Sequence, residues 1–201
     1  LDSIDGTGQS VLYDVGNALQ KLKDAGKKII AVGDYYTRSS YYLASFADEI
    51  ILNTDGIVEL YGFGRSRLFY KSLLDKLKID FNVFRVGTFK SAVEPYIADE
   101  MSSAAKEANL SYLNVLWDSY KDVVAKNRGL SASEIQNLVD NADVILTNPD
   151  ESTAEALKSY GLVDKLLPRT KTRTYLKEIF GESEDGKTFA RISGYDYFQL
   201  L

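Results

Sequence analysis

The sequence predicts an α/β fold, with a mostly parallel sheet over roughly the first 100 residues and a helical region after it. One observation is that short apolar runs alternate with segments of helical periodicity between residues 9 and 87. Alternation at this spacing is typical of parallel strands joined by right-handed helical crossovers. The other observation is a change at residue 103, where one long amphipathic segment begins.

The first four elements are predicted to be a helix, a strand, a helix and a strand. Residues 9–26 place their apolar side chains on one helical face, and the glycine that ends this stretch is a typical helix stop. KKIIAVG at 27–33 is a short apolar run ending in glycine, which indicates a buried strand. Residues 39–48 then predict a short helix, and 49–53 predict a second strand.

Three more elements complete this core, which we expect to cover about residues 1–100. GIVELYGFG at 56–64 is compatible with a strand that has glycine-rich edges. Residues 68–78 have helical periodicity, and FNVFRVG at 81–87 has the composition of a strand.

The helical region is expected over about residues 101–180. Residues 103–128 carry their apolar side chains on one face, and a glycine follows directly. Ser131 and Glu134 have the spacing of a capping box, which predicts that a further short helix starts there.

The rest of this region is predicted to be helical as well. Residues 152–167 indicate a helix stopped by Gly161 and followed by a short apolar segment. Residues 175–180 indicate one more helical turn, and the tail at 181–201 carries no clear pattern. We expect these parts and the core to form one domain.

Composition excludes several classes of protein. The 201 residues carry a net charge of −5, which argues against nucleic acid as a partner because nothing here could neutralise a run of phosphates. No apolar stretch approaches the ~18–20 residues needed to cross a bilayer, and the start has no signal-peptide pattern. The chain does not begin with methionine, so we expect it to be a piece of a longer protein whose anchor lies elsewhere.

The chain contains neither cysteine nor histidine. This excludes disulfides, thiol nucleophiles, Ser-His-Asp triads and histidine-based zinc sites. Acid–base chemistry must therefore use Asp, Glu, Tyr or Lys, and we expect no metal or organic cofactor. The carboxylates Glu94, Asp99 and Glu100 are close in sequence, but such a group on a loop is expected to be solvated.

Lys90 lies just after the predicted strand at 81–87, within FRVGTFKSAVEPY at 84–96. A lysine that works as a general base near neutral pH needs its pKa lowered by about three units, which burial against apolar walls can supply. Phe89, Val93 and neighbouring apolar residues are candidates for such walls. Lysine is rarely buried, however, so the residues alone leave open an ordinary exposed lysine.

Two blocks, KSLLDKLKIDFNVFRVGTFKSAVEPY at 71–96 and SSYYLASFADEI at 39–50, resemble the signal peptide peptidase family, peptidase family S49, and FRVGTFKSAVEPY at 84–96 is the most specific part. The resemblance is to the N-terminal half of the long, two-halved form and covers nearly all of the chain. It implies a fold similar to the Clp protease and crotonase enzymes, with repeated β-β-α units. It also implies a Ser–Lys dyad that hydrolyses hydrophobic signal peptides after their cleavage.

Carried over residue by residue, the resemblance places Lys90 at the general base, with Thr88 or Ser91 as candidates to orient it. At the nucleophile the chain departs from the family, because Arg38 occupies the place of the serine and serines replace the two glycines after it. Ser39 or Ser40 could take over in principle, but attack geometry tolerates little displacement. We therefore expect the serine to come from a C-terminal half that is absent here, and this chain alone to be inactive.

The resemblance further implies a homo-oligomer at the periplasmic face of the inner membrane. Two other interpretations stay open. One is a non-catalytic structural domain that holds the subunits of the same oligomer together. The other is a crotonase-type acyl-thioester enzyme, which would need a coenzyme A pocket.

Overall fold

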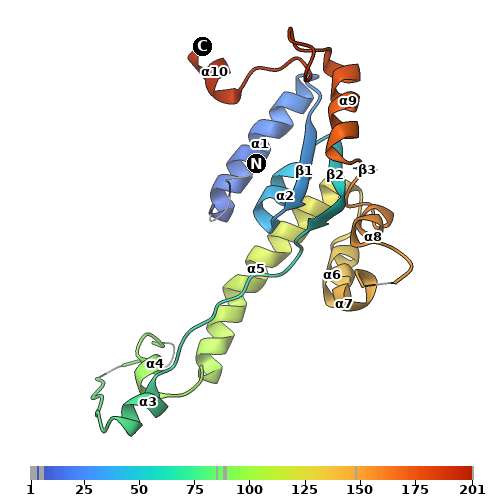
Figure 1. Cartoon of the computed structure of the whole chain (residues 1–201). Helices are drawn as coiled ribbons and strands as arrows, with labels where there is room; N and C mark the ends of the chain where they lie inside the picture. The colour runs from blue at the N-terminus through green and yellow to red at the C-terminus, as the bar shows by residue number, and fades with distance from the viewer. Residues whose placement is uncertain (1–3, 5–6, 85, 88–89, 148, 201) are drawn as a thin grey trace. The chain divides into compact units, whose positions relative to one another are not determined.

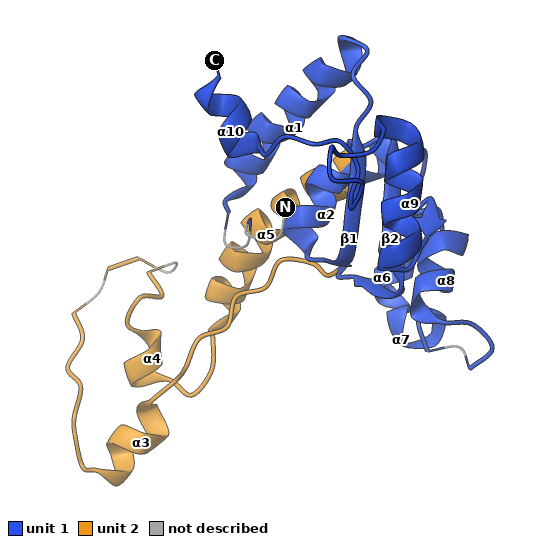
Figure 2. Cartoon of the chain, turned by 45° about the horizontal axis from the view of Figure 1, so that its top comes forward, with its two compact units in different colours: residues 1–60, 124–201 blue, residues 61–123 orange. Residues whose placement is uncertain are grey.

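The computed structural model describes residues 4, 7–84, 86–87, 90–147 and 149–200. The chain forms two compact units, drawn in different colours in Figure 2: residues 1–60 with 124–201 make unit 1, and residues 61–123 make unit 2. These boundaries differ from the sequence-based division into about 1–100, 101–180 and 181–201. The reason is that a strand which follows the helical region in the sequence pairs with a strand from the first part of the chain.

Unit 1 contains a small parallel sheet in the order β1-β2-β3, formed by β1 (Ile30–Tyr36), β2 (Glu49–Val58) and β3 (Lys165–Leu166). Every pairing among these strands is parallel, which confirms the predicted α/β class with a parallel sheet. The strand predicted at 49–53 and the start of the one predicted at 56–64 belong to a single strand in the structure. β2 is continuous from Glu49 to Val58, and residues 59–64 lie outside it.

A register shift between Gly33 and Tyr35 of β1 occurs where β2 carries Gly56. A Cβ atom at Gly56 would lie 2.7 Å from the carbonyl oxygen of Asp34, closer than Cβ atoms in proteins approach other atoms. Glycine is therefore required where the two strands come close at this bulge.

Helices of unit 1 lie on both sides of this sheet (Figure 1). They are α1 (Gln9–Asp24), α2 (Arg38–Ala44), the end of α5 (Ser103–Arg128), α6 (Ala132–Asp140), α7 (Ala142–Ile145), α8 (Thr153–Ser159), α9 (Arg169–Phe180) and α10 (Gly194–Gln199). The predicted long helix and the capping box that opens α6 are confirmed. The predicted last turn at 175–180 is too short, because Pro168 caps a helix that already starts at Arg169.

The core of unit 1 is built from apolar side chains of the sheet and of the helices that contact it. α2 contacts β1 and β2, and α8 contacts β2 and β3. The largest side chains that are almost fully buried in this unit are Tyr36, Tyr41, Tyr42, Leu43, Ile50, Ile51, Leu52, Ile135, Leu157, Leu162 and Val124. Burial of this much apolar surface is the main stabilising contribution to the unit.

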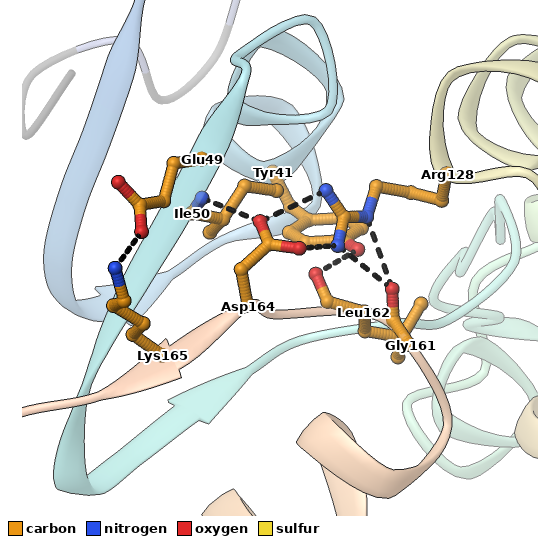
Figure 3. Close-up of polar contacts among 8 residues, drawn as sticks. All are labelled: Tyr41, Glu49, Ile50, Arg128, Gly161, Leu162, Asp164 and Lys165. Atoms are coloured by element: carbon orange, nitrogen blue, oxygen red, sulfur yellow. Dashed lines mark hydrogen bonds and ion pairs between the residues drawn. The ribbon is translucent and has the colours of Figure 1, made fainter.

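Arg128, the last residue of α5, holds together segments that are far apart in sequence (Figure 3). Its Nη2 atom donates to Asp164 Oδ1 at 2.7 Å and to the Gly161 carbonyl at 2.9 Å, and its Nε donates to the same carbonyl at 3.0 Å. Asp164 Oδ2 accepts from the backbone N–H of Ile50 at 2.7 Å. One guanidinium and one carboxylate thus join α5, the loop before β3, and β2.

Tyr41 of α2 adds a buried polar contact to this region. Its side chain is 0% exposed, and its hydroxyl donates to the Leu162 carbonyl at 2.7 Å. Burial raises the pKa of Tyr41 well above its usual range, since the phenolate would lose its hydration. Figure 3 shows the ring lying beside the Arg128 guanidinium.

Unit 2 contains α3 (Lys71–Lys76), α4 (Glu94–Ile97) and the first part of α5. The predicted strand at 81–87 is wrong: its described residues, 81–84 and 86–87, form no strand. Phe84 and Val86 are 100% and 83% exposed, so this apolar run has no sheet to enter. Within the described ranges, no helix is both long and apolar enough to span a membrane.

The Arg128 contacts predict a large loss of stability on truncation. In Arg128→Ala, Asp164 and the Gly161 carbonyl lose their charged partner, which we expect to lower the free energy of unfolding by about 2–4 kcal/mol. Arg169→Ala is the matched control, because Arg169 pairs with Asp34 at the surface, its side chain 81% exposed, where solvent screens the ion pair and its loss costs little stability. Urea unfolding of both variants measures the difference, and equal losses would contradict this account.

Tyr41→Phe is expected to lower the free energy of unfolding by about 1–3 kcal/mol, because the Leu162 carbonyl loses its donor. The folded-state pKa of Tyr41 is raised, so this contribution is present below about pH 10, where the unfolded tyrosine ionises, and is lost as the pH rises further. The stability difference between wild type and variant should therefore shrink above about pH 10. Stability curves that stay parallel from pH 8 to 11 would show that Tyr41 is not the group responsible.

Candidate functional site

Lys90 lies in unit 2, on a turn between Gly87 and α4. Its backbone N–H points at the Gly87 carbonyl, 3.4 Å away. The aliphatic part of its side chain lies over Gly87, where an added Cβ would be 3.7–3.8 Å from the Lys90 Cγ, Cδ and Cε atoms. Gly87 has a φ of +109°, which glycine tolerates and other residues rarely adopt, so this turn depends on glycine.

The apolar walls expected around Lys90 are not assembled in this part of the chain. Lys90 and Ala92 are exposed and Val93 is half-buried, whereas Phe89 lies outside the described residues. Tyr96 is 41% exposed and stacks on Phe81, with ring centroids 4.7 Å apart. The desolvation that a general-base lysine needs is therefore not supplied by these side chains.

Lys90 instead lines an open cavity of about 710 Å³. Arg65 and Arg67 contribute two further cationic side chains to its lining, and Phe84 and Val86 contribute exposed apolar ones. A positively charged and partly apolar surface of this kind suits a ligand that is apolar and carries an anionic or strongly polar group.

The sequence offered two residues, Thr88 and Ser91, that could orient the Lys90 side chain, and the structure describes one of them. Thr88 lies outside the described residues. Ser91 is half-buried, and its carbonyl oxygen accepts a hydrogen bond from Arg67 Nη1 at 2.9 Å. An orienting role for the Ser91 hydroxyl stays a prediction.

One of the three carboxylates that we expected to be solvated is buried, and the three do not form a cluster. Glu94 is 3% exposed and accepts from the Ser102 hydroxyl at 2.6 Å, which corrects the prediction for this residue. Asp99 is exposed and accepts from the Ser72 hydroxyl and N–H, which lower the pKa of its carboxyl group. In the ranges that the structure describes, no three acidic side chains are placed to hold a metal ion. The adjacent Pro95, which favours a helix start, was the available signal that Glu94 belongs to an ordered helix.

Arg38 is the first residue of α2, directly after β1, in unit 1. Thr37 caps the helix: its hydroxyl accepts from the Ser40 N–H at 3.2 Å. Ser40 is 5% exposed, and its hydroxyl donates to the Thr37 carbonyl at 3.2 Å, whereas Ser39 is half-buried. The Ser40 hydroxyl is thus engaged in the helix cap, which disfavours it as a substitute nucleophile.

Comparison with known sequences gives consistent relatives. Residues 21–179 match Peptidase family S49. "Protease 4" of Salmonella typhi is 41% identical over 201 residues, covering 98% of this chain and 32% of the relative. "Protease 4" of Haemophilus influenzae is 39% identical over 191 residues, covering 93% of this chain and 30% of the relative.

A more distant relative is a plant protein, "Serine protease SPPA, chloroplastic" of Arabidopsis thaliana. It is 25% identical over 185 residues, which cover 90% of this chain and 25% of the relative. The chain therefore spans about a third or less of the length of these curated relatives.

The exposure of Lys90 predicts fast chemical modification of the chain on its own. Brief treatment with acetic anhydride, followed by mass spectrometry of peptides, should modify Lys90 at a rate close to that of Lys106, whose side chain is 54% exposed. Lys121 should react more slowly, because its side chain is 13% exposed and pairs with Asp118 at 3.0 Å. If Lys90 reacted as slowly as Lys121, its exposed placement would be wrong.

Proposed function

The chain belongs to peptidase family S49, and we propose that it is the N-terminal, lysine-donating part of a longer Ser–Lys endopeptidase. Lys90 is the general base in this proposal, and the serine comes from a C-terminal half. The substrates are hydrophobic signal peptides that remain after cleavage. On its own, the chain is expected to be inactive.

The observation that carries the proposal is an exposed lysine that lines a partly apolar cavity, in a chain that has no histidine. A second protein surface laid over this cavity would desolvate the amine and favour its neutral form. A neutral amine can take a proton from a serine hydroxyl where histidine is absent.

The proposed reaction has two stages. The serine oxygen attacks the peptide carbonyl while Lys90 Nζ takes the hydroxyl proton, and the resulting ammonium then gives a proton to the leaving amine as the C–N bond breaks. Water next attacks the acyl-enzyme ester and gives its proton to Lys90. The ammonium returns a proton to the serine oxygen as the carboxylic acid product leaves, which restores both groups.

Three observations support an external serine. Arg38 cannot act as a nucleophile in this chemistry, because a guanidinium is always protonated and donates rather than attacks. Ser40, two residues later, has its hydroxyl bonded to Thr37 and is almost fully buried. This chain aligns with about a third or less of the length of each curated relative. The rest of such a protein is long enough to include a second half that bears the serine.

The remaining features of the proposal follow from family membership. We expect the wider fold to be of the Clp protease and crotonase type, built from repeated β-β-α units around the small parallel sheet. The assembled enzyme is expected to be a homo-oligomer at the periplasmic face of the inner membrane, without a metal or organic cofactor. Exposed Phe84 and Val86 beside Lys90 suit an apolar peptide.

A purely structural role in the same oligomer is the second candidate. It is favoured by the exposed apolar side chains of unit 2, among them Leu68, Leu73, Leu77 and Val115. Surfaces of this kind mark interfaces between subunits. The two candidates differ in what they predict for Lys90.

Hydrolysis of a fluorogenic hydrophobic peptide amide tests the proposal. The chain alone should give no turnover, and mixing it with the separately made C-terminal half should give turnover that Lys90→Ala abolishes, with a loss of at least about 1000-fold for a missing base. Lys106→Ala is the matched control, because this exposed lysine lies on α5 and pairs with Glu100.

Turnover by the mixture that is unaffected by Lys90→Ala would favour the structural role. Turnover by the chain alone would mean that a residue such as Ser39 is a working nucleophile. Either result would overturn the proposed division of the dyad.

A further inference from the structure

We propose that Arg67 is a positioning residue that fixes the backbone beside Lys90, so that the amine meets the serine in the assembled enzyme. The inference rests on the proposed function of Lys90. It concerns a residue outside the two sequence blocks that carry the family resemblance. Its basis is the set of contacts made by Gly87 and by residues 90–95.

The central contact is the hydrogen bond from Arg67 Nη1 to the Ser91 carbonyl oxygen, at 2.9 Å. The same oxygen accepts from the backbone N–H of Glu94 at 3.1 Å. Two donors thus converge on one carbonyl and fix the direction of the peptide unit that follows Ser91. This peptide unit meets the Lys90–Ser91 peptide unit at the Cα atom of Ser91. Holding it in one direction therefore restricts the position of the Lys90 Cα atom, from which the lysine side chain extends.

The C-terminal side of the turn is held by other contacts. Glu94 is buried and accepts from the Ser102 hydroxyl at 2.6 Å. The Pro95 carbonyl accepts from the backbone N–H of Tyr70 at 2.6 Å. These contacts hold the start of α4, and the Arg67 bond extends that restraint to the residue next to Lys90.

On the N-terminal side, the backbone N–H of Lys90 points at the Gly87 carbonyl, 3.4 Å away. Gly87, at a φ of +109°, is the residue type with the widest choice of backbone conformations. A restraint on the residue that follows Lys90 adds to this contact. The charged donor on Ser91 supplies this restraint, because hydrogen bonds from charged groups are the stronger ones.

Arg65 provides a matched comparison. It lines the same cavity as Arg67 and carries the same charge, but it is exposed, and its Nη1 donates to Asn109 Oδ1 at 3.2 Å on α5. Arg67, by contrast, is half-buried. A role for positive charge alone would involve both arginines, whereas a positioning role involves Arg67.

The test measures kcat, KM and the pH profile of kcat/KM for Arg67→Gln, Arg67→Lys and Arg65→Gln in the assembled enzyme, with the fluorogenic amide. Arg67→Gln should lower kcat on the order of 10- to 100-fold, since a displacement of about 1 Å costs about that much, with a smaller change in KM. Both glutamine variants remove one cation from the cavity, so a shift of the pH midpoint that is common to both reports charge and not position. Arg67→Lys keeps a charged donor and should recover kcat to within a few-fold of wild type. Arg65→Gln changes the lining of the same cavity without touching the backbone beside Lys90, so it should act mainly on KM and lower kcat by less than Arg67→Gln does.

Three outcomes would overturn the inference. They are a wild-type kcat in Arg67→Gln, an equal loss and equal pH shift in both glutamine variants, and a loss in Arg67→Lys as large as that in Lys90→Ala. Should Arg67→Gln fail to fold, as judged by its melting curve, the lysine variant decides. Failure of the proposed function is separate, because it appears as activity that survives Lys90→Ala whatever the arginine variants do.

Discussion

The ionic contact between Arg128 and Asp164 is the interaction on which the arrangement of unit 1 depends. It joins the end of α5, the loop before β3 and the backbone of β2, which no run of local hydrogen bonds could connect. The Arg128 side chain is 8% exposed and the Asp164 side chain 36%, so the contact is partly shielded from solvent, and its loss would remove the charged partner of Asp164. The buried hydroxyl of Tyr41 adds a second tie, from α2 to the residue after Gly161. The small parallel sheet is therefore held by polar contacts at one end and by apolar packing along its faces.

The candidate site has a different character. Lys90 is held by a turn that combines a glycine with positive φ, a helix start anchored through Glu94, and the Arg67 bond to Ser91. Its amine-bearing side chain is nevertheless exposed beside a cavity of about 710 Å³. A lysine that is positioned but not desolvated is consistent with our proposal that this chain provides half of a catalytic pair. The proposal assigns the nucleophile and a low-dielectric wall to a second half.

Sequence reasoning succeeded where local pattern decides the outcome and failed where the partner is distant. The long helix at 103–128 and the capping box at Ser131 were predicted correctly, because periodicity and caps are local properties. The strand at 81–87 was not, because an apolar run becomes a strand only if a neighbouring strand accepts its hydrogen bonds. Lys90 was singled out by family resemblance, since spacing alone could not separate it from other lysines. The Arg67–Ser91 bond joins residues 24 apart and left no local signal.

The measurement that tests the central claim most directly is labelling of the assembled enzyme with a fluorophosphonate, which reacts with activated serines, followed by mass spectrometry of the modified peptide. The account predicts one labelled serine, located outside this chain, with labelling that disappears in Lys90→Ala. Labelling of Ser39 or Ser40, or labelling of an outside serine that is unaffected by Lys90→Ala, would contradict a dyad shared between the two halves.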